Sequence, residues 1–261
     1  MIRLERRDGR PLWIGHRGAP ALAPENTLAS FRAAVDAGVD LIEFDVLELD
    51  GGEVVVAHSR DLYEVSHGAL RGTLAAMTLE ELREACPDLP TLDEALAFFV
   101  DEAPEVGAQV DLKSPAAAPA IANSLRQFGL LDRSFVSAVH PRALRRLAAL
   151  EPRLRLGITF PRDVLRLGRR PDGPVAGGGL RTLRTVTPRL VGPLLARSRA
   201  TALVLHHRVL GEAAVRAAHA RGAAVVTWTV DDPLELDRVD QAGVDAVVTN
   251  DPSIFVSTLE T

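Results

Sequence analysis

The stretch that decides the fold runs from Ile14 to His58 and reads IGHRGAPALAPENTLASFRAAVDAGVDLIEFDVLELDGGEVVVAH. An apolar run ends at His16, residues 27–37 have helical periodicity, and a second apolar run covers residues 40–49. A strand, a helix and a strand with short connections predict two parallel strands joined by a helical crossover.

The same alternation continues to the end of the chain. Further strands are expected over residues 53–58, 109–113, 134–139, 154–159, 202–206, 223–230 and 245–249. Helices are expected over residues 79–85, 92–100, 116–128, 142–149, 211–220 and 233–241, with a last one from residue 252. Residues 59–90 are otherwise irregular. Residues 161–199 are rich in Arg, Gly and Pro, and we expect short helices and a loop there.

Chain length and strand number favour one class of fold. The chain has 261 residues, close to the roughly 250 of a barrel with eight main strands. We therefore predict an α/β fold, a (β/α)8 TIM barrel, in which functional side chains lie at the carboxyl ends of the strands. A doubly wound open sheet is the alternative. It is disfavoured because no glycine-rich dinucleotide loop follows the first strand.

Composition restricts the partners and the compartment. The net charge is -5 and no polybasic surface is evident, so nucleic acid is not an expected partner. No apolar run reaches the ~18 residues of a membrane-spanning helix, and residues 1–10 lack the apolar core of a signal peptide. We expect a cytoplasmic protein with no stable membrane insertion. The single cysteine, Cys86, allows no intramolecular disulfide and is interpreted as a small hydrophobic residue.

Two carboxylates share one strand of the decisive stretch. Glu43 and Asp45 are two residues apart and therefore point to the same face. Their neighbours are apolar, so the strand is expected to be buried on both faces, where carboxylates are costly unless they are paired or bind a metal. The pair predicts a hard divalent cation with oxygen ligands.

A second strand repeats this arrangement with one acid and one base. Asp111 and Lys113 are two residues apart, and Lys113 is the only lysine in a chain with 30 basic residues. A strand-internal lysine needs a reason to be there. Its compact charge suits a phosphate oxygen, and its amine would suit Schiff-base chemistry.

Histidines end several of the predicted strands. His16 and His58 bracket the carboxylate pair, which favours a general acid and a general base over two structural histidines. Three further histidines also end strands, and one of them could line the same pocket: His140, His206 and His207.

Other side chains near the strand ends suit substrate binding. Arg17 precedes Gly18, and its guanidinium matches the geometry of a phosphate. Thr27 is expected to cap the following helix, whereas Asn26 suits a cap and the site equally. Trp228 is either a core residue or an aromatic wall for a small polyol.

The motifs taken together resemble the glycerophosphodiester phosphodiesterase family, and the resemblance runs almost from end to end. The pieces that carry it are His16-Arg17-Gly18, Pro24-Glu25-Asn26-Thr27, Glu43-Phe44-Asp45, His58, Leu89-Pro90-Thr91-Leu92, Asp111-Leu112-Lys113, Thr227-Trp228-Thr229-Val230, and the ending from Gly243-Val244-Asp245 to Thr249-Asn250-Asp251-Pro252.

The resemblance implies a single barrel domain, residues 1–261, with a small insertion over residues 59–90 after the second strand. It also implies metal-dependent hydrolysis of glycerophosphodiesters, with a small-molecule substrate and Ca2+ or Mg2+ as cofactor. By position, the implied metal ligands are Glu43, Asp45 and Asp111, the acid–base pair is His16 and His58, and the substrate-binding residues are Arg17, Lys113 and Trp228.

Two positions depart from the family pattern. Asp111 stands where glutamate is usual and is one methylene shorter, and Ser59 follows the second histidine where aspartate is usual. The shorter Asp111 is expected to shift the ion, recruit a water or change metal preference. Ser59, which has no charge, is expected to change metal affinity or the charge on His58, so both positions bear on substrate and metal identity.

Four readings of the chemistry stay open at the level of sequence. Metal-assisted phosphodiester hydrolysis is the main one, through either water or the glycerol hydroxyl as nucleophile. The others are a lipid-cleaving phosphodiesterase of related barrel fold, a lyase or aldolase that uses Lys113 as a Schiff base, and a barrel that binds phosphodiesters without turnover.

Overall fold

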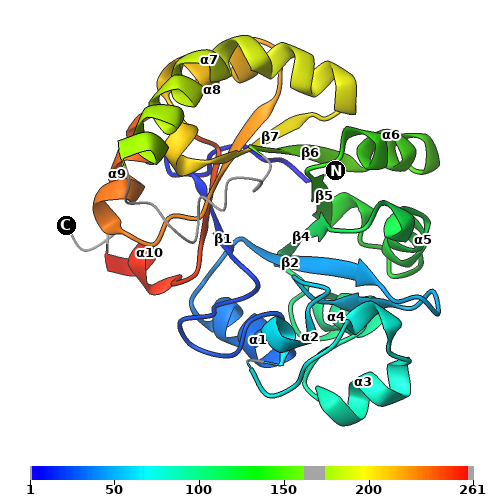
Figure 1. Ribbon diagram of the computed structural model, residues 1–261. Coiled ribbons are helices and arrows are strands. Elements are labelled where there is room, and N and C mark those ends of the chain that lie inside the picture. The colour runs from blue at the N-terminus through cyan, green and yellow to red at the C-terminus, as the bar shows by residue number, and fades with distance from the viewer. Residues whose placement is uncertain (1, 67, 162–173, 258–261) are drawn as a thin grey trace.

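The computed structural model describes residues 2–66, 68–161 and 174–257 and shows a closed parallel barrel surrounded by helices (Figure 1). The first strand pairs with both the second and the last, which closes the barrel. The eight barrel strands are β1 (Leu12–Gly15), β2 (Leu41–Glu48), β4 (Gly107–Leu112), β5 (Ser134–Ala138), β6 (Arg155–Phe160), β7 (Ala202–His206), β8 (Ala224–Trp228) and β9 (Ala246–Thr249). The predicted TIM barrel is confirmed.

Helices follow the strands and form the outer layer. They are α1 (Leu28–Asp36), α4 (Leu92–Asp101), α5 (Ala118–Gln127), α6 (Pro141–Leu150), α7 (Pro174–Ser198), α8 (Glu212–His219), α9 (Pro233–Gln241) and α10 (Ser253–Ser257). Short 3-10 turns η2 (Pro115–Ala117), η3 (Leu131–Arg133) and η5 (His207–Val209) complete the connections. Among the described residues, no helix is both long and apolar enough to cross a bilayer.

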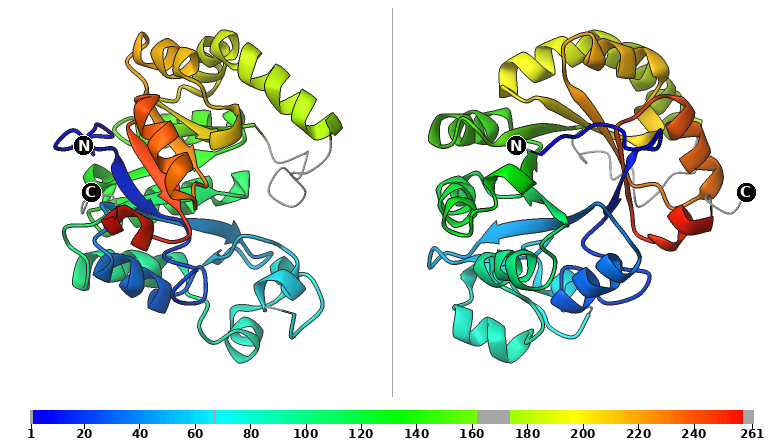
Figure 2. Two further views of the ribbon diagram at one scale, coloured as in Figure 1. Left: turned by 90° about the vertical axis from the view of Figure 1, so that its left-hand side faces the viewer. Right: turned by 180° about the vertical axis from the view of Figure 1, so that it is seen from behind.

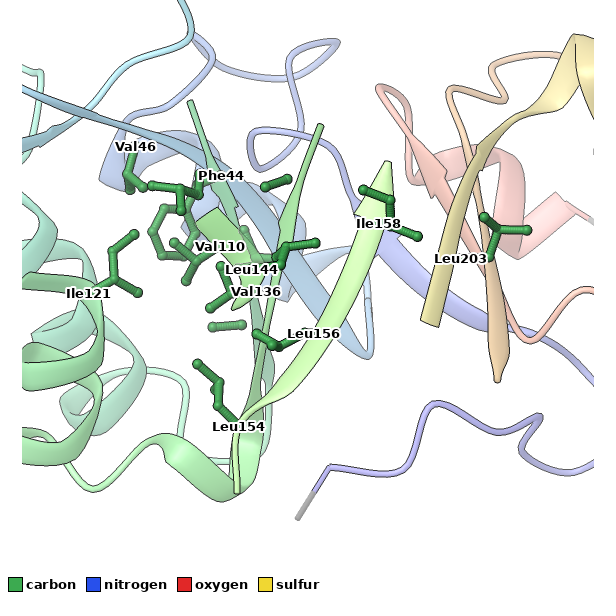
Figure 3. Close-up of a cluster of buried hydrophobic side chains, with 14 of the residues drawn as sticks. Phe44, Val46, Val110, Ile121, Val136, Leu144, Leu154, Leu156, Ile158 and Leu203 are labelled. Atoms are coloured by element: carbon green, nitrogen blue, oxygen red, sulfur yellow. The ribbon is translucent and has the colours of Figure 1, made fainter. Parts of the chain in front are cut away.

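Two apolar layers stabilise the barrel because strand side chains alternate between its inside and its outside. The outer layer packs the strands against the helices, as Phe44, Val110 and Val136 do against Ile121 of α5 and Leu144 of α6 (Figure 3). The inner layer contains Leu12, Ile14, Leu41, Phe135, Val204, Val226 and Val248. Leu4 joins this inner cluster from the N-terminal segment.

Residues 59–90 pack beside the barrel near the end of β2. The antiparallel strand β3 (Val54–Val56) pairs with β2, and the segment then forms α2 (Leu62–Val65), η1 (Leu74–Ala76) and α3 (Leu79–Ala85). Its apolar side chains form a separate cluster with the β2–β3 hairpin. The left view of Figure 2 shows this segment and the N-terminus on opposite sides of the molecule. The sequence predicted only one of its helical pieces.

The prediction of short helices and a loop over residues 161–199 is wrong where the structure describes them. Residues 174–198 form one helix, α7, with Pro188 and Pro193 inside it. Packing overrides the local signal, because Val191 and Leu195 are buried in the main core and Leu183 packs against it. Residues 162–173 lie outside the described part of the chain.

Candidate active site

Three carboxylates meet at the carboxyl ends of β2 and β4. Asp45 and Asp111 are paired in register, and Glu43 precedes Asp45 by two residues. Their exposed fractions are 4% for Glu43, 0% for Asp45 and 8% for Asp111. One oxygen atom from each lies within 4.8 Å of the other two. Asp111 reaches this cluster although its side chain is short.

Two cations neutralise part of this charge. Lys113 Nζ lies 2.7 Å from Asp45 Oδ1 and 2.5 Å from Asp111 Oδ2. Arg17 Nε lies 2.9 Å from Asp45 Oδ2, and its Nη1 donates to both oxygens of Glu25 at 2.8 and 2.9 Å. Asp45 is therefore held between the sole lysine and a half-buried arginine.

The pKa values of the site reflect this crowding. Although burial favours the neutral carboxyl, Lys113 and Arg17 hold the pKa of Asp45 well below its usual range. The pKa of Glu43 is raised, first by burial and then by the charges of Asp45 and Asp111. Three buried acids thus exceed the charge of two nearby cations. A hard divalent cation with oxygen ligands fits this donor set.

Lys113 stays protonated in this environment. Burial opposes the charged ammonium, but Asp111, Asp45 and Glu43 outweigh it and raise the pKa of the amine. A lysine that forms a Schiff base must lose its proton to become a nucleophile. The lyase or aldolase reading is therefore disfavoured.

His16 is oriented by a chain of polar contacts. Its Nδ1 lies 2.6 Å from Asn250 Oδ1, while Asn250 Nδ2 donates to Asp231 Oδ2 at 2.7 Å. Because Asn250 Nδ2 donates to Asp231, Asn250 Oδ1 faces His16 and accepts a hydrogen bond from its Nδ1–H. The Nε2 atom is left without a proton and lies 3.9 Å from Glu43 Oε2. Burial first, and then Arg17, lower the pKa of His16 to about 4.

The loop between β1 and α1 brings backbone groups to the carboxylates. Arg17 has φ 50° and Gly18 has φ 88°, both left-handed. In this conformation the Arg17 N–H donates to Glu43 Oε2 at 2.9 Å. A Cβ atom on Gly18 would lie 2.3 Å from Ser30 Oγ, so glycine is required there.

Asn26 and Thr27 divide the two roles expected of them. Thr27 is the N-cap of α1 and accepts from Ser30 N at 3.1 Å. Asn26 has φ 59° and bonds both to the side chain of Asp45 and to its backbone N–H, each at 3.2 Å. Asn26 thus holds a carboxylate of the site.

A cavity of about 530 Å³ joins these groups. It is lined by His16, Arg17, Glu25, Glu43, His58, Glu64, Gln109, Asp111, Lys113, Val139, Thr159, Pro161, Val204, Trp228, Thr229 and Val248. Of the sequence-predicted set, only Asp45 does not line the cavity, because it is covered by its partners. His58 is exposed at the end of β3. The lining residues do not include the three alternatives His140, His206 and His207.

Some functional candidates were not found from the sequence. Asn250 contacts His16, and Asp231 contacts Asn250. Gln109 and Thr159 line the cavity. Thr159 is one polar residue in an apolar strand, and Asp231 and Asn250 stand in the loops after β8 and β9. The alternation of side chains along a strand could have identified Gln109, because it lies two residues before Asp111 and therefore on the same face.

A second cavity of about 220 Å³ lies between the loop before α1 and residues 59–90. Ser59 and Cys86 line it, together with Glu25, His58 and Glu64, which it shares with the larger cavity. Ser59 Oγ accepts from Asp61 N at 3.1 Å. At this position a serine organises the turn into α2.

Comparison with known proteins gives a consistent family. Residues 16–254 match the model of the glycerophosphoryl diester phosphodiesterase family. A glycerophosphodiester phosphodiesterase of Caldanaerobacter subterraneus subsp. tengcongensis is 25% identical over 95% of this chain and 97% of its own length. Glycerophosphodiester phosphodiesterase GDPD4 of Arabidopsis thaliana is 28% identical over 96% of this chain and 74% of its own.

A solved structure shares the fold. An Oleispira antarctica phosphodiesterase in complex with the product sn-glycerol-3-phosphate superimposes with a TM-score of 0.75, at 23% identity, over 97% of this chain and 98% of its own. The match of the family model covers nearly the whole barrel, and the acidic trio, the two histidines and the two cations all lie within it. The chain therefore belongs to the glycerophosphoryl diester phosphodiesterase family.

Proposed function

We propose that this protein hydrolyses glycerophosphodiesters to glycerol 3-phosphate and an alcohol in a metal-dependent reaction. The observation that carries the proposal is one cavity lined by Glu43 and Asp111 of the buried acidic trio, by two cations and by two histidines, with Asp45 ion-paired to both cations. Anionic oxygens, a hard cation and two imidazoles are the groups that phosphodiester hydrolysis requires. The family and the names of its relatives support the same reaction.

The trio would hold the cation, and Ca2+ and Mg2+ are the ions we propose because all three ligands are carboxylates. When bound, the cation supplies charge neutralisation for the phosphoryl oxygens and polarisation of the nucleophile. The raised pKa of Glu43 supports this role, because burial first, and then the charges of Asp45 and Asp111, disfavour its ionised form unless further positive charge is present.

The remaining residues have separable roles in the proposed reaction. His16 takes a proton from the nucleophile through Nε2, because its Nδ1 proton is held by Asn250. His58 gives a proton to the leaving alkoxide from its exposed position on the cavity. Lys113 and Arg17 stabilise charge that develops on the phosphoryl group. Trp228 forms one wall for the substrate.

The substrate class follows from the family and from one relative. The Oleispira antarctica protein binds sn-glycerol-3-phosphate as its product, and this chain shares its fold. We propose the same product here, formed in one catalytic domain, residues 1–261, in which residues 59–90 are an insertion. This insertion carries Glu64, which lines the cavity.

Replacement of the histidines tests this assignment. His16→Ala and His58→Ala should each lower the release of glycerol 3-phosphate from glycerophosphocholine by roughly 10²- to 10⁴-fold. A coupled assay for glycerol 3-phosphate measures this. His219→Ala at the end of α8 is the matched control, because His219 does not line the cavity, and it should keep wild-type activity. Wild-type protein that binds the diester without releasing product would favour a non-catalytic barrel.

A further inference from the structure

Two neighbouring helices on the outside of the barrel carry arginines without acids. The C-terminal end of α7 lies beside α6 (Figure 1). Neither helix contains an Asp or a Glu, although the chain has a net charge of -5. The exposed arginines of the two helices and of the residue after α7, here called the basic surface, are Arg142, Arg145, Arg146, Arg181, Arg184, Arg189, Arg197 and Arg199.

Three of these arginines meet at one groove. Its volume is about 610 Å³, and it is lined by Arg142 and Arg145 of α6 and Arg197 of α7, together with Pro115, His140, Pro141 and Leu194. No acidic residue is among the lining residues. None of the three guanidinium groups has an ion pair or a hydrogen bond with a residue that the structure describes. The groove therefore concentrates positive charge that the described protein does not neutralise.

The arginines of α6 are placed unfavourably for the helix itself. The N-terminus of a helix carries a partial positive charge, and acidic side chains stabilise its first turn. The first turn of α6 has no acid and contains Arg142, and the side chain of the N-cap His140 makes no capping hydrogen bond. Arg145 and Arg146 follow in the next turn. A bound phosphate would neutralise both these guanidinium groups and the helix end.

An exposed apolar side chain on α6 favours a lipid surface over a nucleic acid. Arg142, Arg146 and Leu150 follow one another at intervals of four residues and therefore share one side of the helix. Leu150 is 43% exposed. Neither α6 nor α7 has an aromatic residue on which a base could stack. An anionic bilayer offers phosphates to the guanidinium groups and an apolar layer to Leu150.

The negative net charge of the chain does not prevent this contact. Exposed charges are screened over about 8 Å at physiological ionic strength, so a bilayer responds mainly to the charges that it touches. Glu151, which follows α6, is buried and paired with Arg126, and Glu212 on the neighbouring α8 is paired with Arg216. Because the arginines are spread over two helices, the sequence alone predicted no polybasic surface.

We propose that the basic surface, centred on the groove between α6 and α7, binds the phosphate groups of an anionic phospholipid bilayer. The contact is electrostatic and lies on the outside of the barrel, so it needs no segment that crosses the bilayer. It goes beyond the proposed function and does not depend on it, since the groove shares no lining residue with the catalytic cavity. Each arginine beside an anionic surface contributes roughly fivefold to the affinity.

Co-sedimentation of the intact protein with vesicles tests the proposal. Wild-type protein should bind vesicles of equal parts phosphatidylcholine and phosphatidylglycerol, should not bind phosphatidylcholine alone, and should be released by high salt. The triple variant Arg142→Gln/Arg145→Gln/Arg197→Gln should bind at least about 30-fold more weakly. Leu150→Ser should weaken binding by about two- to fivefold, because it removes the apolar contact.

A second triple variant is the matched control for overall charge. Arg32→Gln/Arg83→Gln/Arg216→Gln removes the same number of arginines, each of which is paired with a glutamate outside the basic surface. It should bind anionic vesicles as wild type does. Thermal unfolding checks that both triple variants are folded. If the first one is not, Arg197→Gln alone replaces it, with an expected loss of about fivefold.

Several results would overturn the proposal. They are equal vesicle binding by the two triple variants, no binding of wild-type protein to anionic vesicles, and equal binding to phosphatidylcholine alone. Tighter binding of a DNA duplex than of vesicles at the same phosphate concentration would assign the surface to nucleic acid instead. Release from vesicles by inorganic phosphate, but not by chloride of equal ionic strength, would assign the groove to a free phosphate.

Discussion

At the scale of single residues, the site is governed by the cost of burying charge. Asp45 is fully buried and is stabilised by Lys113, Arg17 and Asn26. A buried carboxylate is tolerated only with such partners. Two of these partners, Lys113 and Arg17, are also the cations that we propose for the phosphoryl group.

Asn250 is a positioning residue for His16. Asn250→Ala removes the acceptor of the Nδ1 proton, so the imidazole can rotate or change tautomer. We expect kcat to fall by roughly 10- to 100-fold with little change in KM, by analogy with the loss of other orienting groups. Steady-state kinetics on glycerophosphocholine measure this split.

Asn123→Ala on the surface of α5 is the control for Asn250→Ala, because Asn123 is exposed and its Oδ1 accepts from the exposed Arg126 at 3.1 Å. It should match wild type. An unaltered kcat in Asn250→Ala would show that the contact does not position His16.

His206 should make the protein sensitive to acid. Burial, followed by the charges of His207 and Arg208, lowers its pKa to about 4. The unfolded chain then binds more protons than the folded protein between about pH 6.5 and pH 4. Stability is therefore full above this window and is lost as the pH falls through it.

Replacing His206 tests this acid sensitivity. In His206→Gln, the loss of unfolding free energy between pH 7 and pH 4.5 should be smaller by about 2 kcal/mol than in wild type. Urea unfolding at a series of pH values measures it. Equal pH slopes in the two proteins would mean that His206 is not responsible.

At the scale of elements, the loop from β1 to α1 is the most constrained connection. Gly18 packs against Ser30, whose Oγ donates to Arg17 O at 3.0 Å and accepts from Ala19 N at 2.7 Å. These contacts fix the turn that presents the Arg17 N–H to Glu43. The first strand, the loop and the helix thus position the site as one unit.

Two glycines with similar backbones separate conformation from packing. Gly18 and Gly38 both have positive φ, 88° and 78°, but a Cβ on Gly38 would meet only open space. Gly38→Ala should cost about 1 kcal/mol from backbone conformation alone. Gly18→Ala should cost at least about 2–3 kcal/mol because steric overlap is added. Urea unfolding compares them, and equal losses would contradict the packing argument.

The sequence predicted elements well where periodicity and local breaks agree. The alternation of strands and helices that begins with the apolar run ending at His16 predicted the strands of the barrel. The Glu43–Asp45 spacing predicted two members of the acidic trio. The prediction was wrong for α7. Pro188 and Pro193 are residues that usually break a helix, but burial of Val191 and Leu195 in the core stabilises a continuous helix. Thr159 was missed because a single polar residue carries no periodic signal, and Asn250 was noted only as part of a motif, since its contact with His16 depends on the closed barrel.

At the scale of the whole molecule, closure of the barrel creates the site. Pairing of β1 with β9 brings Asn250 next to His16, 234 positions apart in sequence. Pairing of β2 with β4 brings Asp111 to Asp45 across the intervening residues 59–90. Only the closed sheet brings the acidic trio and the two histidines together, and the family match over residues 16–254 includes all of them.

The most direct test of the central claim is the release of glycerol 3-phosphate from glycerophosphocholine by wild-type protein, before and after removal of divalent cations. We predict that turnover is lost after exhaustive treatment with a chelator and returns when Mg2+ or Ca2+ is added, because Glu43, Asp45 and Asp111 hold the cation. Full activity in excess chelator, or no release of glycerol 3-phosphate with either ion present, would contradict the account.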